Sequence, residues 1–107
     1  MIFNTQNTLN FSNKIISFEF MVKEVIPFKE IYLVLFDPSS NKKKWGVFPN
    51  LYAFDKQGNQ LWIAELSIYG SYYKIEVTGG RIVAIAPSCD CLINPQNGKI
   101  MEEIFTK

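Results

Sequence analysis

Residues 50–66 read NLYAFDKQGNQLWIAEL, which is an apolar run, a polar turn and a second apolar run. A carboxylate such as Asp55 can accept the backbone N–H two residues further on, and Gly58 suits the left-handed position of a tight turn. Trp62 can then anchor the returning run by packing across to the first. The stretch predicts a β-hairpin whose turn fixes the pairing register.

The same pattern recurs as an internal repeat. Residues 34–45 (VLFDPSSNKKKW) and 91–101 (CLINPQNGKIM) each place Asp or Asn between an apolar run and a turn. Asp37 and Asn94 occupy the position of Asp55, and each is followed by a proline that presets the next φ angle. We expect both to act as turn residues.

Aromatic and β-branched residues, punctuated at short intervals by turn residues, predict strands along the chain. A further hairpin is predicted to turn at Gly79 and Gly80. The expected fold is all-β: a single domain over residues 1–107, with an antiparallel meander of about eight or nine strands that forms a small sandwich or barrel. The strand candidates are residues 14–23, 29–37, 43–48, 50–55, 60–68, 71–78, 81–87, 89–94 and 99–105.

Side-chain alternation assigns faces to several of these strands. Residues 14–22 have one apolar face and so predict a strand covered on one side. Residues 30–36 and 60–66 are apolar on both faces, which is typical of central strands. Pro27 has no N–H for a ladder, so we expect residues 24–28 to form a loop. The apolar face of residues 14–22 consists of Ile16, Phe18, Phe20 and Val22.

Charge and length restrict the class of protein. Eleven basic and ten acidic residues give a net charge of +1, so no overall field draws the chain to nucleic acid or to an anionic membrane. The first residues lack the features of a signal peptide, and we expect a cytoplasmic protein. Cys89 and Cys91 are one residue apart, where a mutual disulfide would be strained, so reduced thiols are expected.

The residue content argues against common catalytic chemistry. The chain has no histidine, which removes the usual general base and a common metal ligand, and it has no phosphate-binding loop. Cys89 and Cys91 supply two thiolates, too few for a structural zinc site. We therefore expect no catalytic, cofactor-binding or metal-binding residues, and a protein that is not an enzyme.

Two resemblances can be stated from these residues. The hairpin LYAFDKQGNQLW, residues 51–62, resembles the repeat of quinoprotein-type β-propellers, in which a Trp packs between blades, and residues 91–101 are similar to a degenerate copy with Met101 in place of the Trp. A complete propeller needs more strands than this chain has. In size, composition and hairpin style the chain also resembles small bacterial immunity proteins of contact-dependent growth inhibition.

The second resemblance implies a protein that neutralises a cognate toxin, for example a nuclease, by covering it. Lys43 lies in the only lysine run, and Trp45 and the outward-pointing Tyr72 are candidate anchors, with Tyr73 expected to point inward. A basic toxin cleft would need clustered acidic groups on this chain. The alternative function is a small β-barrel that binds an apolar ligand. The predicted partner-binding residues are Lys43, Trp45, Tyr72, Asp55, Asp90 and Glu102, with Glu65 and Glu103 as further acidic candidates.

Overall fold

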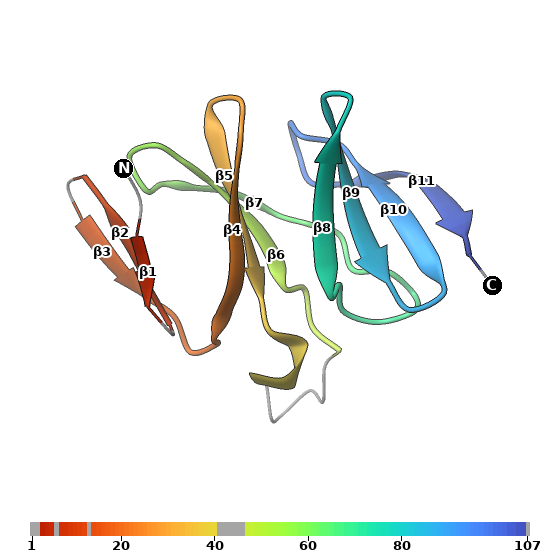
Figure 1. The fold of residues 1–107 in the computed structure, drawn as a ribbon, viewed down its shortest axis with the longest axis horizontal. Coiled ribbons are helices and arrows are strands. Elements are labelled where there is room, and N and C mark those ends of the chain that lie inside the picture. Colours follow the sequence, from red (N-terminus) through yellow and green to blue (C-terminus); the bar gives the residue numbers. More distant parts are fainter. Residues whose placement is uncertain (1–2, 6, 13, 41–46, 107) are drawn as a thin grey trace.

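The computed structural model describes residues 3–5, 7–12, 14–40 and 47–106. Three antiparallel sheets follow one another along the longest dimension, 42 Å (Figure 1). The all-β antiparallel prediction is confirmed, and none of the sheets formed by these residues closes on itself. Within the described ranges, no helix is long and apolar enough to cross a membrane.

The first sheet is a three-stranded N-terminal meander. Its inner face packs on the central sheet through Leu9 and Phe11, which are both buried. Phe18 and Phe20 continue this layer and meet the ring of Phe36 edge-on at 4.8 and 5.9 Å. The strands, in the order β1-β2-β3, are β1 (Phe3–Thr5), β2 (Thr8–Phe11) and β3 (Lys14–Ser17).

The central sheet buries both of its faces. In β5, Leu33 and Leu35 enter the hydrophobic cluster shared with the third sheet, while Val34 and Phe36 enter the cluster shared with the first. All four side chains are fully buried, so the prediction that this segment is a central strand is confirmed. The strands, in the order β4-β5-β6-β7, are β4 (Val22–Phe28), β5 (Ile31–Phe36), β6 (Leu51–Asp55) and β7 (Gln60–Ile63), with a short 3₁₀ turn, η1 (Pro38–Ser40), after β5.

The third sheet repeats the four-stranded meander and packs one face on the central sheet. Ile82, Ala84 and Ile93 are among its buried inward-facing side chains. The strands, in the order β11-β10-β9-β8, are β8 (Lys74–Thr78), β9 (Arg81–Ala86), β10 (Cys89–Ile93) and β11 (Ile100–Phe105).

The predicted turn chemistry is confirmed. Asp37, Asp55 and Asn94 each accept, through Oδ1, the backbone N–H two residues further on, at 2.9 Å in every case. Gly58 and Gly98 have φ angles of +90° and +77°, the left-handed conformation expected of them. These turns are local, so a few neighbouring residues determine them.

The N-terminal half departs from the expected strand pattern. The strand expected over residues 14–23 is interrupted at residues 18–21, although its apolar face does pack on the central sheet. Residues 24–28, expected to form a loop, belong to β4. Pro27 is tolerated because β4 is an edge strand, where a missing N–H costs no ladder bond. The strands β1 and β2 were not anticipated.

One further strand prediction is wrong in its environment, and another lies mostly outside the described residues. Residues 60–66 were expected to form a central strand, but β7 is the edge of its sheet, and Leu61 and Ile63 are 47% and 41% exposed. The strand expected over residues 43–48 lies mostly outside the described residues, and Val47 and Phe48 are not in a strand.

Trp62 connects the central sheet to the third. Its Nε1 donates to the carbonyl oxygen of Pro95 at 2.9 Å, and its ring lies against the Cα of Gly98. A Cβ added to Gly98 would lie 2.5 Å from the Trp62 ring, so only glycine fits beneath the indole. The hairpin turn of one sheet therefore fits onto the tryptophan of the other.

Candidate functional site

The outward face of the third sheet is the candidate site. It lies at one end of the stack of sheets, on the side of β8–β11 away from the central sheet (Figure 1). Alternation along β9 and β10 directs every second side chain outward, because the intervening ones fill the core. Two rows of paired residues cross this outer face: Lys74, Ile85, Asp90 and Ile104, and Glu76, Val83, Leu92 and Glu102.

The two middle strands, β9 and β10, contribute mainly apolar side chains to the outer face, with Asp90 among them, and charged side chains lie at its margins on β8 and β11. Val83, Ile85 and Leu92 are half-buried, and Ile104 is 52% exposed. In the described part of the chain, the hydrophobic clusters do not include any of these four side chains. An apolar centre with a polar rim is the usual arrangement of a protein-binding surface.

Charge is unevenly distributed over the outer face. On β8, Lys74 Nζ lies 3.4 Å from Glu76 Oε2, so these charges largely offset each other. Asp90 and Glu102 lie in adjacent rows of neighbouring strands, which makes them diagonal neighbours roughly 7–8 Å apart between Cα atoms. Arg81 is at the hairpin end, paired with Thr78. The β10–β11 half of the face is therefore acidic.

The structure thus brings together two of the six predicted partner-binding residues, Asp90 and Glu102. The two further acidic candidates lie elsewhere: Glu65 Oε1 accepts the Ile100 N–H at 2.9 Å, and Glu103 points to the inner side of β11, level with Cys91. Period-two alternation in RIVAIA and CDCLI was the signal that would have found the apolar centre from sequence.

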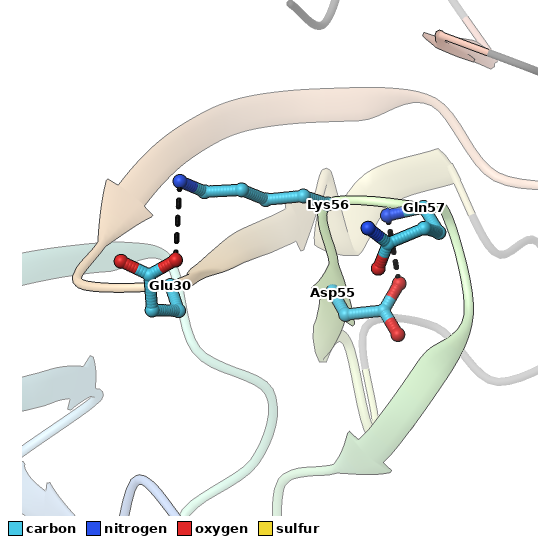
Figure 2. A network of polar contacts seen from close by, with 4 residues as sticks. All are labelled: Glu30, Asp55, Lys56 and Gln57. Atoms are coloured by element: carbon cyan, nitrogen blue, oxygen red, sulfur yellow. Dashed lines mark hydrogen bonds and ion pairs between the residues drawn. The ribbon is translucent and has the colours of Figure 1, made fainter.

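Asp55 is not part of this face. It lies in the β6–β7 turn, where Gln57 N–H donates to its carboxylate and the next residue, Lys56, pairs with Glu30 at 3.2 Å (Figure 2). Hydrogen bonds from Asn59, through its backbone and its side chain, lower the pKa of Asp55. The Asp55 carboxylate therefore stabilises the β6–β7 turn.

Tyr72 is buried, so the prediction that it points outward is wrong. Its N–H donates to Asn50 Oδ1 at 2.9 Å and its hydroxyl donates to the Glu65 carbonyl at 2.7 Å. Burial raises the pKa of this phenol well above its usual range. The strand begins at Lys74 rather than at residue 71, so alternation does not reach Tyr72, and Tyr73 is the exposed ring.

Lys43 and Trp45 lie outside the described residues. The two predictions that place them at a partner interface therefore stay predictions.

Cys89 and Cys91 lie on the inner face of β10. Both are buried, with 3.8 Å between their sulfur atoms, and with Glu103 they place three donor atoms within 4.8 Å of one another. Burial is the main reason why the pKa of Cys91 is raised to about 11. A metal ion binds thiolates, so an ion at this position would have to displace protons from buried thiols.

Apolar side chains fill both spaces between the sheets. A surface groove of about 320 Å³ lies between the β4–β5 and β10–β11 turns, where Phe28, Ile31 and Pro95 provide its apolar lining. It is open to solvent and includes charged Lys29 and Glu30. This geometry differs from the enclosed apolar interior that a ligand-binding barrel would offer.

Residues 1–105 match a family described as a domain of unknown function, DUF7957, and the chain belongs to this family. Comparison with curated proteins and with solved structures gave no match.

Proposed function

We propose that the protein is a non-enzymatic binding module, and that it acts as an immunity protein that neutralises a cognate toxin by occluding it. The outer face of β8–β11 is the observation that carries this proposal. It combines an apolar group at its centre, made by Val83, Ile85 and Leu92, with charged side chains beside that group. A rigid sheet of this kind loses little conformational entropy when it binds.

The charge of the outer face favours a basic partner surface. Asp90 and Glu102 supply an acidic half on a chain whose net charge is only +1. A cleft that binds nucleic acid is basic, so a nuclease toxin fits this surface by charge. Complementary charge would speed association and select the partner, while the apolar centre would slow dissociation.

The decisive experiment co-expresses the full chain with the toxin domain encoded by the neighbouring open reading frame. We expect growth to be rescued and a one-to-one complex to be recovered. A double charge reversal, Asp90→Lys with Glu102→Lys, should slow association and weaken rescue, because it turns the acidic half basic.

The matched control is Glu30→Lys, which reverses an exposed carboxylate at the β4–β5 turn, away from the outer face. It should rescue growth as the wild type does. Failure of the wild-type protein to bind or protect against the neighbouring toxin domain would contradict the immunity function, and equal behaviour of the two sets of variants would contradict the assignment of the face.

A further inference from the structure

The strand β11 ends the third sheet with an open backbone edge. It pairs only with β10 among the described strands. The Thr106 N–H donates to the Ser88 carbonyl at 3.1 Å, and hydrogen-bonded pairs alternate along an antiparallel ladder. Glu102 and Ile104 therefore direct their N–H groups to β10, whereas Glu103 and Phe105 direct theirs away from the sheet.

The edge at β4 is closed by comparison. Pro27 offers no N–H there, and the pairing register shifts at Lys23. The ammonium group of Lys23 also donates to the Tyr73 carbonyl, beside the start of β8. Such features keep other strands from adding to a sheet. The outward backbone groups of Glu103 and Phe105 have no comparable protection within the described residues.

The side chains of β11 indicate what could add to this edge. Phe105, on the inner side of β11, is 58% exposed and its ring packs edge-on against Tyr69 at 5.7 Å, whereas exposed Ile104 points to the outer face. Two carboxylates, Glu102 and Glu103, occupy the middle of the strand. A second copy paired antiparallel about this middle would place carboxylate opposite carboxylate, which is unfavourable. A segment with basic residues at the facing positions has the complementary charge.

We propose that β11 accepts an extended, basic segment of a protein partner as a fifth strand of the sheet. The segment would exchange backbone hydrogen bonds with Glu103 and Phe105, place Lys or Arg opposite Glu102, and set apolar side chains beside Ile104 and Phe105. This inference rests on the proposed protein-binding function and adds the mode of recognition. The added strand would extend the outer face at its acidic side.

The test follows amide hydrogen exchange in the full chain, with a capped decapeptide that carries two consecutive lysines between valines and threonines. With about 1 mM of this peptide, we expect the amides of Glu103 and Phe105 to exchange at least about twofold more slowly, since they gain hydrogen bonds and a Kd of about 1 mM fills half of the sites. A peptide with glutamates in place of the lysines should give no protection. Glu102→Lys with Glu103→Lys should abolish the effect of the lysine peptide.

Phe105→Pro is the second variant, because it removes one outward N–H and no bond to β10. This variant should weaken binding of the peptide, while the remaining amides between β10 and β11 stay protected from exchange. The peptide is used at about 1 mM, a concentration that detects even a millimolar Kd. Protection at another edge, or no protection at all, overturns the inference. A toxin complex in which Glu103 and Phe105 still exchange freely refutes this docking mode alone, whereas peptide binding without any toxin complex refutes the immunity function alone.

Discussion

The central sheet and the third sheet are the same four-stranded antiparallel meander in different surroundings. The central sheet has hydrophobic clusters on both faces, and β5 contributes buried side chains to each. The third sheet buries only the face that carries Cys89, Cys91 and Ile93, and leaves the face with Val83 and Leu92 open. One sheet holds the molecule together, and the other presents a surface.

This difference separates residues needed for stability from residues available for binding. A side chain enclosed by neighbours leaves a cavity when truncated, while a side chain on an open face does not. The same substitution should therefore cost much more stability in the central sheet than on the outer face of the third sheet.

The largest expected effect compares Leu35→Ala with Leu92→Ala. Leu35 is fully buried in the central sheet, so its truncation should lower the free energy of unfolding by about 3–5 kcal/mol. Leu92 is half-buried on the outer face, so its truncation should lower the free energy of unfolding by about 1 kcal/mol or less. Urea unfolding of both variants measures the difference. Equal losses would mean that the outer face is packed like a core.

The second effect concerns the junction between the two sheets. Gly98→Ala places a methyl group against the Trp62 ring and should cost about 2–4 kcal/mol, from left-handed strain plus overpacking. Gly79→Ala is the matched control, since Gly79 also has a positive φ, +58°, but open space around it. It should cost about 1 kcal/mol. Thermal or urea unfolding measures both variants. If the two lose the same free energy of unfolding, Trp62 does not hold the two sheets together.

The success and failure of sequence reasoning follow the range of the interactions involved. Asp55 and Asn94 were assigned correctly because their hydrogen bonds stay within a turn. The two faces of residues 30–36 were assigned correctly because alternation determines them. Tyr72 was misplaced because Asn50, 22 residues away, fixes its backbone before the strand begins.

The candidate site was only partly predictable for the same reason. Asp90 and Glu102 were chosen from sequence, but nothing local shows that they share a face, because this depends on the pairing of β10 with β11. The edge position of residues 60–66 also depends on which strands pair, so their apolar pattern suggested the wrong environment.

Thiol reactivity distinguishes the two faces of the third sheet. Cys89 and Cys91 on the inner face should react with an aromatic disulfide reagent at pH 8 about a hundredfold more slowly than an exposed thiol, because burial raises the pKa of Cys91 and blocks access. A cysteine placed on the outer face by Leu92→Cys should react quickly. Fast reaction of the native pair in the folded protein would show that the core between the sheets opens readily.

The smallest effect is acid sensitivity at the end of the central sheet. Because hydrogen bonds lower the pKa of Asp55 in the folded protein, its contribution to stability is present above the unfolded pKa, about 3.9, and is lost as the pH falls through the lower folded value. Asp55→Asn should therefore lose less stability than the wild type between about pH 5 and pH 2. Urea midpoints of the variant and the wild type, measured across this pH range, test the prediction. If both midpoints fall equally with pH, Asp55 does not stabilise the turn in this way.

The most direct test of the outer face as a binding surface measures how Leu92→Lys and Ile15→Lys bind the partner that the proposed function predicts, a toxin domain encoded beside this chain. Both variants place a lysine at an apolar side chain, but Leu92 is at the centre of the outer face, whereas Ile15, 70% exposed, is on the first sheet. If the open face is the binding surface, the Kd of Leu92→Lys should rise at least about 100-fold while Ile15→Lys binds as the wild type does. Wild-type affinity of a folded Leu92→Lys would contradict the assignment of the outer face as the binding surface.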